Sequence, residues 1–378
     1  MKILFTQTYY LPYISGLTIY AQKLTRGLVK NGHQITIITH RHQKKLKKNV
    51  SEKGVRLIRA PFLFRIHKGF FSPAWPWYCL EGVIKNQIII CNLPQIEAFW
   101  PVLWAKIFKK RTIVIYTCQI ILPDGSLNRF IEKGLRIIHW LICLMADDIV
   151  VYTKDYAKNV PLLKKFGKKI TAILPPITVK KEKKKLTAKI ASLIKKKQQS
   201  LVIGFAARIA SEKGLEYLIK TIPILKKRYR HFKLVIIGPK KEVAGEEKYF
   251  QKINQLAKKY SQIIFLGTLK STEMASFYRL IDILVLPSLN STEAFGLVQV
   301  EAMLNGTPVV ASNLPGVRVP IQLTKMGKIV PPRNTKAIAQ AIITITGNKK
   351  RYSLPHDEVK KIFSARKTFQ KFDSIIKK

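Results

Sequence analysis

The sequence predicts an α/β protein of two domains, each built on a mainly parallel sheet. Its 378 residues are enough for two domains of ordinary size. Short apolar, β-branched runs alternate with amphipathic helical stretches along the whole chain, which is the pattern of parallel strands joined by crossover helices. A hydrophobic content of 47% supports a folded chain. A lysine-rich stretch near residues 175–198 divides the two series of strands.

The first domain opens with a β-loop-α-β unit. A buried strand is expected at 2–6, a loop with Pro12 and Gly16 follows, a helix runs to about Lys30, and a second strand covers 34–39. Gly16 opens the helix, so the backbone there could approach a phosphate or a sugar; an ordinary turn residue is the equally simple interpretation. Further strands are predicted at 55–59, 87–91, 112–116 and 148–152, with helices at 95–109 and 126–144.

The domain boundary follows Pro175 and Pro176. We expect an N-terminal domain over 1–176, a basic linker over 177–198, a C-terminal domain over 199–358 and a helical segment over 359–378. The strands of the second domain are predicted at 201–205, 233–237, 263–266, 283–286, 309–311 and 328–330.

The charge is extreme: 68 Lys+Arg against 21 Asp+Glu give +47. Three interpretations compete, namely nucleic-acid binding, attraction to an anionic membrane, and a lysine bias without function. Because no recognised nucleic-acid module is present, we favour membrane attraction superimposed on the bias. Two stretches, 62–78 and 99–111, combine aromatic with basic residues. Core packing explains most of these aromatics, and an interfacial surface explains the combination.

The four cysteines, Cys79, Cys91, Cys118 and Cys143, show neither disulfide nor zinc-site spacing, so we expect reduced core residues in a cytosolic protein. Residues 1–8 lack the features of a signal peptide. The longest apolar stretch, 135–145, is too short to cross a bilayer. We therefore expect a cytoplasmic chain, soluble or peripheral at the inner face of the membrane.

The segment 286–312 has the pattern of strand, polar loop, helix, turn and strand. Gly296 precedes the helix, 297–304, which ends at Asn305–Gly306. Such a corner places backbone amides at the carboxyl edge of a sheet, where α/β proteins bind phosphorylated ligands. Glu293 lies in the loop and Glu301 in the helix. A capping partner or a solvated face is the common role for such residues, but Glu301 has apolar neighbours and therefore needs a partner or a ligand.

Arg208 and Lys213 span a second strand-to-helix loop, where their charges could converge on one diphosphate. The chain has no P-loop motif, which argues against a P-loop NTPase. It also has no D-x-D sequence, which weakens any scheme that depends on Mg²⁺. No metal site is predicted.

Three segments together resemble the retaining glycosyltransferases of family 4. Glu293 and Glu301, within PSLNSTEAFGLVQVEAMLNGTPVVAS, are similar to the E-x7-E donor-site motif of that family. The segments GFAARIASEKGLEYLI and YYLPYISG…LVKNGHQITIIT are also similar and stand in the same order. The resemblance implies the GT-B architecture of two facing Rossmann-like domains with an interdomain cleft, and a last helical segment that crosses back to the first domain.

The resemblance also implies an activity. It is the metal-independent transfer, with retention, of a sugar from a nucleotide diphosphate sugar to a lipid-linked or polysaccharide acceptor. Hexosyl transfer at the cytoplasmic membrane face is expected. The nucleotide sugar is a co-substrate, and no other cofactor is implied.

Roles carry over to matching positions. Arg208 and Lys213 would hold the diphosphate and neutralise the leaving group, and Glu293 would meet the hydroxyls of the sugar. The remaining donor-binding positions have these implied roles: Glu301 accepts hydrogen bonds from the ribose, Gly267 to Leu269 line the base pocket, and Gly16 faces the diphosphate. The backbone amides of Phe295, Gly296 and Leu297 contact the sugar and phosphate.

One segment departs from the family pattern. Many relatives carry Y-H-x-D, whereas this chain has Tyr116-Thr117-Cys118-Gln119, so Thr117 and Gln119 would form the facing wall of the donor site. Two alternatives therefore stand beside the enzyme. One is a non-catalytic homologue that binds a sugar nucleotide or glycan, and the other is a polyanion-binding structural protein.

Overall fold

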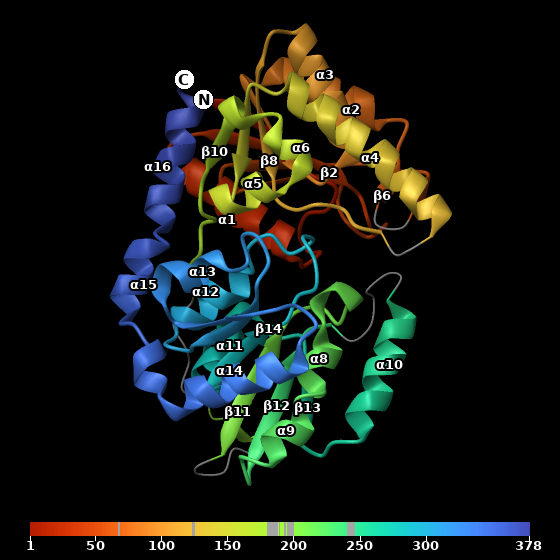
Figure 1. Cartoon of the computed structure of the whole chain (residues 1–378). Helices are drawn as coiled ribbons and strands as arrows, with labels where there is room; N and C mark the ends of the chain where they lie inside the picture. Colours follow the sequence, from red (N-terminus) through yellow and green to blue (C-terminus); the bar gives the residue numbers. More distant parts are fainter. Residues whose placement is uncertain are drawn as a thin grey trace. The chain divides into compact units, whose positions relative to one another are not determined.

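The computed structural model of the chain describes residues 1–66, 69–122, 125–179, 188, 190–192, 194, 200–239 and 246–378. Two compact units emerge, one of residues 1–176 with 365–378 and one of residues 177–364. We describe each unit by itself (Figure 1). The lysine run 180–185, expected as part of a linker, lies outside the described residues.

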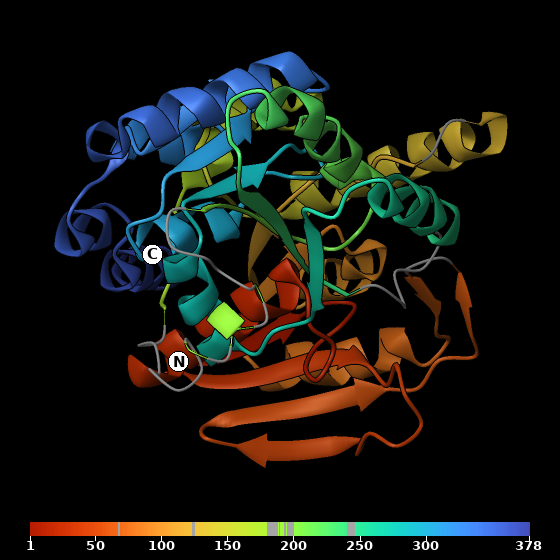
Figure 2. The same ribbon diagram turned by 90° about the horizontal axis from the view of Figure 1, so that it is seen from below.

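The first unit is organised around an eight-stranded sheet with the order β10-β9-β8-β7-β1-β2-β4-β3. All neighbours are parallel except β3, which pairs antiparallel with β4 at the edge (orange pair in Figure 2). The strands are β1 (Lys2–Thr6), β2 (Gln34–His40), β3 (Asn49–Glu52), β4 (Val55–Ala60), β7 (Ile88–Leu93), β8 (Arg111–Tyr116), β9 (Asp148–Val151) and β10 (Ile170–Ala172). A separate hairpin pairs β5 (Phe64–Ile66) with β6 (Gly69–Phe71).

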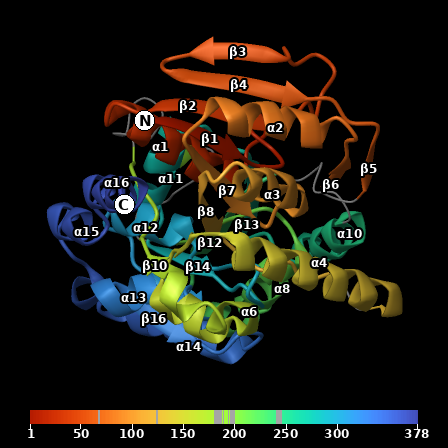
Figure 3. The same cartoon turned by 90° about the horizontal axis from the view of Figure 1, so that it is seen from above.

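The helices of the first unit cover both faces of this sheet. They are α1 (Gly16–Lys30), α2 (Trp75–Lys85), α3 (Phe99–Ile107), α4 (Ser126–Met145), α5 (Lys154–Asn159), α6 (Pro161–Lys164) and α16 (Ala365–Ile376), with 3-10 turns η1 (Ile96–Ala98) and η2 (Gly167–Lys169). The chain moves along the sheet one way from β1 to β2 and the other way from β7 to β9. Right-handed crossovers therefore place α1 on one face and α3 and α4 on the other. Figure 3 shows α2, α3 and α4 side by side.

The last helix, α16, completes the first unit by packing on α1. Asp373 accepts hydrogen bonds from Asn31 Nδ2 at 2.7 Å, and its other oxygen lies 3.0 Å from His33 Nε2. The ring of Phe369 fills the space beside Gly27, where a Cβ atom would come within 2.2 Å of it. Thr368 Oγ1 donates to the Leu174 carbonyl at 2.9 Å. Glycine at position 27 is thus required by the close approach of the two helices.

The second unit has a six-stranded, fully parallel sheet with the order β13-β12-β11-β14-β15-β16. Its strands are β11 (Leu201–Ala206), β12 (Phe232–Ile237), β13 (Ile263–Gly267), β14 (Ile283–Leu286), β15 (Val309–Ser312) and β16 (Gly327–Val330). The helices are α8 (Leu215–Ile219), α9 (Ile222–Lys226), α10 (Glu247–Lys258), α11 (Ser271–Leu280), α12 (Leu297–Met303), α13 (Val319–Thr324), α14 (Thr335–Gly347) and α15 (His356–Ile362), with η3 (Ser211–Lys213) and η4 (Lys349–Tyr352).

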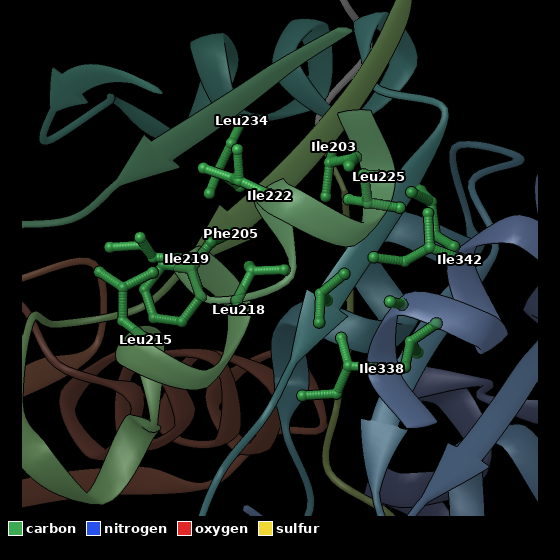
Figure 4. Close-up of a cluster of buried hydrophobic side chains, with 14 of the residues drawn as sticks. Ile203, Phe205, Leu215, Leu218, Ile219, Ile222, Leu225, Leu234, Ile338 and Ile342 are labelled. Atoms are coloured by element: carbon green, nitrogen blue, oxygen red, sulfur yellow. The ribbon is translucent and has the colours of Figure 1, made fainter. Parts of the chain in front are cut away.

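One core of this unit lies between the sheet and α8, α9 and α14. Figure 4 shows side chains from β11, β12 and these helices converging, among them Phe205, Leu218 and Ile342. Phe205 and Ile342 are completely buried, and each such side chain contributes roughly 1.5–3 kcal/mol relative to exposure. The β-branched strand residues fit the pleated surface and fix the strands whose ends carry the site.

The structure confirms the predicted fold class, an α/β protein with two Rossmann-like halves. Three details differ from the sequence analysis. β3 and the β5–β6 hairpin were not predicted, because strands of three or four residues show little periodicity. The segment expected as one C-terminal helical stretch, 359–378, is interrupted at Phe363 and Ser364. Phe363 is 2% exposed and its ring lies 6.2 Å from that of Phe295, so the break turns an aromatic side chain into the second unit.

Candidate functional site

The candidate site of the second unit lies where the direction of the sheet reverses. The chain adds β12 and β13 on one side of β11 and, with β14 next to β11, adds β15 and β16 on the other side. Ligands of open α/β sheets bind at such a switch point, beyond the carboxyl ends of the strands. The two loops there are 207–214, after β11, and 287–296, after β14. Both contain residues that the sequence analysis selected.

Gly214 allows the two loops to approach each other. It has φ 64°, and a Cβ atom there would lie 2.3 Å from the carbonyl oxygen of Pro287. Leu289 N donates to the Glu212 carbonyl at 2.9 Å, which joins the loops through the backbone. A residue with a side chain at position 214 would be strained in its backbone and would also collide with the facing loop.

Lys213 and Glu293 form an ion pair across the loops. Lys213 Nζ lies 2.8 Å from Glu293 Oε2, and the two side chains are 11% and 18% exposed. The second carboxylate oxygen, Oε1, accepts the N–H of Gly296 at 2.9 Å. Glu293 therefore fixes both the ammonium group of one loop and the backbone that leads into α12. A charge-assisted contact with so little exposure is stronger than a surface ion pair.

Arg208 lies on the same loop as Lys213 and has a different counterion. Its Nη2 atom is 2.9 Å from Glu212 Oε1, and the Arg208 side chain is 32% exposed. The guanidinium thus combines a fixed orientation with access to solvent. An anion that arrives at this loop would find two cations that are already positioned, which lowers the cost of ordering them.

The loop into α12 is shaped by Gly296 and Gln299. Gly296 has φ 75°, and a Cβ atom there would lie 2.5 Å from Leu286 Cδ2 and 2.7 Å from Gln299 Nε2. Gln299 is completely buried, and its Nε2 donates to the carbonyls of Phe295 and Val317, each at 2.9 Å. The hydrogen bonds from the buried Gln299 side chain thereby fix the backbone over 295–297, which is expected to bind the donor. Phe295 itself is 1% exposed.

Gln299 was missed in the sequence analysis. So was Ser288, which is completely buried and whose hydroxyl has no hydrogen-bond partner. The available signal was their position: each is a polar residue inside an apolar run beside a selected segment.

Glu301 has a protein partner. Tyr278 of α11 donates its hydroxyl to Glu301 Oε2 at 3.2 Å, and Tyr278 is 1% exposed. Burial, and then the nearby carboxylate, raise the pKa of Tyr278 well above its ordinary value. The phenol therefore remains a donor at neutral pH and orients the carboxylate. The role of Glu301 toward a ribose remains a prediction.

The predicted base-pocket residues lie one strand further from the switch point, beyond β12. Gly267 ends β13 with φ 72°, and its carbonyl accepts the N–H of Gly238 at 2.9 Å. No heavy atom lies within 4 Å of the place a Gly267 Cβ would take. Leu269 is partly exposed in the coil before α11. Their contact with a base remains a prediction.

Gly16, Thr117 and Gln119 belong to the first unit. Gly16 is the first residue of α1, whose capping box joins Ser15 and Thr18. Thr117 is 2% exposed and donates its hydroxyl to the carbonyl of Leu93. Gln119 is partly exposed. Of the two residues predicted to form the facing wall, Thr117 is therefore buried, and its hydroxyl already joins the ends of β8 and β7.

A further group of residues at the carboxyl edge of the first sheet was not predicted. It surrounds the point where β7, β1 and β2 adjoin, which is the switch point of that sheet. Each member has a buried polar side-chain atom without a hydrogen-bond partner: Thr6, Tyr9, His40, His42, Asn92 and Gln95. Such atoms are rare in folded proteins unless water or a ligand meets them. The runs ITHRH and NLPQIE, with polar residues directly after strands, carried this signal.

Aromatic rings enclose this edge group. His40 stacks on Phe70 at 4.9 Å and on Trp75 at 4.3 Å, measured between ring centroids, while Tyr9 stacks on Tyr13 at 4.4 Å. Burial lowers the pKa of His40 to about 4 and raises that of Tyr9 to about 12. Both are therefore neutral at physiological pH. Aromatic faces together with uncharged polar groups suit a polyhydroxylated ring better than an ion.

Among the described residues, no group of three or more His, Cys, Asp or Glu side chains has an arrangement that could hold a metal ion. None of the four cysteines forms a disulfide, and three of them are buried, as expected of core residues. In the part of the chain that the structure describes, no helix combines the length and apolarity needed to cross a bilayer.

Two family models match consecutive parts of the chain. The one described as Glycosyltransferase Family 4 matches residues 14–181, and the one described as Glycosyl transferases group 1 matches residues 177–361. Together they span residues 14–361, which include most of both units.

Similar proteins extend this result. An uncharacterized glycosyltransferase of Methanocaldococcus jannaschii is 25% identical, with 90% of this chain and 88% of that protein covered. The phosphatidylinositol N-acetylglucosaminyltransferase gpi3 subunit of Schizosaccharomyces pombe is 22% identical, over 97% of this chain and 79% of that protein. The crystal structure of Anabaena Alr3699/HepE in complex with UDP-glucose matches with a TM-score of 0.79 and 17% identity, over 100% of this chain and 99% of that one. This last likeness establishes the two-domain GT-B fold.

Proposed function

Because the chain belongs to the family 4 glycosyltransferases, we propose that it transfers a hexose, with retention of configuration, from a nucleotide diphosphate sugar to a lipid-linked or polysaccharide acceptor. Sugar transfer from a nucleotide-sugar donor is the activity that the family supplies. Experiment must test four further parts of the proposal: retention of configuration, the type of sugar, independence of metal ions, and a place at the cytoplasmic face of a membrane.

The Lys213–Glu293 ion pair is the observation that carries the proposal. It sets an ammonium group, a carboxylate and the Gly296 backbone together at a sheet switch point. In a donor complex, Glu293 would accept hydrogen bonds from sugar hydroxyls, while Lys213 would face the diphosphate. Arg208, oriented by Glu212, would take a second phosphate oxygen.

The transfer step follows from these positions. The bond between the anomeric carbon and the diphosphate oxygen breaks, and a bond from that carbon to an acceptor hydroxyl oxygen forms. The hydroxyl proton passes to the leaving diphosphate or to solvent, and nucleoside diphosphate is released. Negative charge grows on the leaving oxygen, so preorganised cations there stabilise the transition state more than the ground state. In our proposal Arg208 and Lys213 do this without a metal ion.

The acceptor would bind the first unit. Tyr9 is the partly exposed member among Tyr9, His40 and Gln95, and its ring suits a sugar or cyclitol ring, whereas the buried His40 and Gln95 would support it from within. The printed name of the Schizosaccharomyces pombe relative specifies phosphatidylinositol as its acceptor. That name supports a lipid-linked hydroxyl in the present chain.

The first test screens nucleotide sugars for a shift in melting temperature, because a donor that binds only the folded state stabilises it by mass action. The stabilising donor is then used to measure nucleotide release with and without acceptor, in the presence and absence of a chelator. NMR of the product reports the anomeric configuration. Donor binding without release under any acceptor would favour the non-catalytic homologue, for which Thr117 in place of the expected histidine is the motive. Inversion, or loss of activity with the chelator, would contradict the corresponding part of the proposal.

A further inference from the structure

The exposed large apolar side chains of this protein are concentrated in one part of the first unit. Among the described residues, all but Met1, Ile14 and Leu323 lie between Leu63 and Leu144. Most of them occur on the β5–β6 hairpin and on the three neighbouring helices α2, α3 and α4; Leu63, Ile96, Phe108 and Ile121 lie in the segments that adjoin these elements. The second unit, similar in size, contributes only Leu323 among the residues described. A soluble surface rarely shows such a concentration without a binding partner.

Helix α4 carries the strongest part of this surface. Its buried residues, His139, Ile142 and Cys143, all lie in the last two turns. The first half extends beyond the sheet, as Figures 1 and 3 both show. There Leu127 is 70% exposed and Phe130 is 76% exposed, although an ordinary surface helix turns such residues toward a core.

The exposed apolar residues of α4 form a stripe. Phe130, Ile137 and Leu144 are spaced by seven residues, so they lie along one line of the helix, and their exposed fractions are 76%, 53% and 47%. This line is distinct from the one that contains the buried Ile142. Helix α4 therefore has two apolar faces, and only one of them packs on the protein.

Basic residues flank the stripe. Arg129, Lys133 and Arg136 are exposed and fall beside it on the helix. The single acidic residue of α4, Glu132, accepts the N–H of Leu122 at 2.5 Å and so is occupied within the protein. An apolar stripe beside a row of cations is the arrangement of a helix that lies in a membrane interface.

The neighbouring helices α2 and α3 also expose large apolar side chains. Trp77 of α2 is 70% exposed, and Trp100 and Ile107 of α3 are 37% and 57% exposed. Helix α3 lies between α2 and α4, so the three helices that carry these exposed apolar side chains are neighbours. Tryptophan is favoured at the headgroup level of a bilayer.

We propose that the outward stripe of α4, with the exposed aromatic residues of α2 and α3, docks the protein onto an anionic lipid surface. A second copy of the chain is the competing occupant, but it would oppose Arg129, Lys133 and Arg136 to their own counterparts on a chain of net charge +47. The proposal deepens the proposed function, since it brings the first unit to a lipid-linked acceptor. Docking itself needs no donor and is measured separately.

The experiment uses the full chain and two kinds of vesicle, phosphatidylcholine alone and phosphatidylcholine mixed with phosphatidylglycerol. We expect sedimentation with the anionic vesicles and much weaker sedimentation with the neutral ones, with binding reduced by salt. Phe130→Glu and Ile137→Glu should each weaken binding about tenfold or more. Each removes an apolar side chain that would be buried in the lipid and places on the protein a negative charge that the anionic lipid repels. Leu323→Glu, an exposed leucine on α13, is the matched control and should change binding less than about twofold.

Circular dichroism checks that each variant is folded, and donor turnover without vesicles checks the active site. Loss of docking in Phe130→Glu and Ile137→Glu with retained donor turnover supports the proposal. Equal binding of all variants, or no binding of the unmodified chain, overturns it and leaves the proposed sugar transfer intact, although no binding would also contradict the proposed place at the membrane face. Light scattering that reveals a dimer dissociated by Ile137→Glu, without lipid binding, overturns it in favour of a second copy. Docking without donor turnover would instead refute the proposed function alone.

Discussion

Lys213 Nζ and Glu293 Oε2 lie 2.8 Å apart and join two loops that are 80 residues apart in the sequence. These loops follow β11 and β14, the two strands that meet at the switch point of the second sheet. Glu293 also accepts the N–H of Gly296, so one carboxylate sets the positions of a cation and of a backbone turn. The electrostatics and the shape of the site are therefore coupled through this residue.

Lys213→Met should lower kcat/KM of sugar transfer about a hundredfold or more, because it removes a preorganised cation where negative charge develops. Lys349→Met is the matched control, since Lys349 forms a 3.0 Å ion pair with Asp282 at the opposite end of the strands. It should leave transfer within about twofold. Steady-state kinetics of both variants compares them. Equal losses in the two would contradict a specific role for Lys213.

Gly296→Ala should destabilise the protein more than Gly306→Ala. Both glycines have positive φ, 75° and 79°, so both substitutions incur similar backbone strain. Only at Gly296 would the new Cβ meet other atoms, Leu286 Cδ2 at 2.5 Å and Gln299 Nε2 at 2.7 Å; around Gly306 no heavy atom lies within 4 Å. We expect roughly 1–2 kcal/mol for Gly306→Ala and about 1–3 kcal/mol more for Gly296→Ala. Urea unfolding measures both, and equal midpoints would refute the steric argument.

Gln299→Glu should destabilise the second unit although the side chain keeps its shape. The amide nitrogen donates to the carbonyls of Phe295 and Val317 in a fully buried site, and a carboxylate cannot donate there. The expected cost is on the order of 2–4 kcal/mol. Gln340→Glu on the exposed side of α14 is the control and should change stability by less than about 0.5 kcal/mol. A larger donor KM in Gln299→Glu would further show that the 295–297 backbone depends on this support.

His40 should make the protein less stable in mild acid. Burial lowers its pKa from 6.5 to about 4, so between these values the unfolded chain binds more protons than the folded chain. Its contribution is therefore fully present above about pH 6.5 and is lost as pH falls toward 4. The full loss is on the order of 3 kcal/mol.

His40→Phe tests this dependence, because phenylalanine keeps a ring between Phe70 and Trp75 and cannot be protonated. Urea midpoints at several pH values should fall less steeply in acid than those of the unmodified chain. His231→Phe, at an exposed position, should leave the slope unchanged. An unaltered slope in His40→Phe would assign the acid sensitivity to other groups, such as the buried His139, whose pKa burial also lowers to about 4.

Much of the fold could be predicted because apolar runs with β-branched residues have a strong local signal. The strand at Ile283–Leu286 and the helix that begins after Gly296 are found where the pattern places them. Short elements such as the β5–β6 hairpin depend on partners distant from any local signal. The break at Phe363 likewise follows from a tertiary contact, with Phe295, and not from a helix-breaking residue.

The candidate donor site could be selected from the sequence because its residues follow strands, because carboxylates are few (21 Asp+Glu), and because the segments around Arg208 and Glu293 resemble a known family. The ion-pair partners of these residues could not all be predicted. Glu212 is only four residues from Arg208, but Glu293 is 80 residues from Lys213, and only the folded loops bring that second pair together. The edge group of the first unit was missed for a related reason, since His40 at the end of β2 and Gln95 beyond β7 reach the same edge of the sheet only when β1 pairs with both strands.

Helix α16 has a consequence for how the chain is made. Asp373 and Phe369 complete the surface of α1, yet they follow the whole second unit in the sequence. Domains ordinarily fold in the order in which they leave the ribosome. Here residues 177–364 have all been synthesised before residues 365–378 can cover α1, so the second unit can fold while the first is still incomplete. A nascent chain that stalls before residue 365 would leave the surface beside Gly27 uncovered, because Phe369 would not yet fill that space.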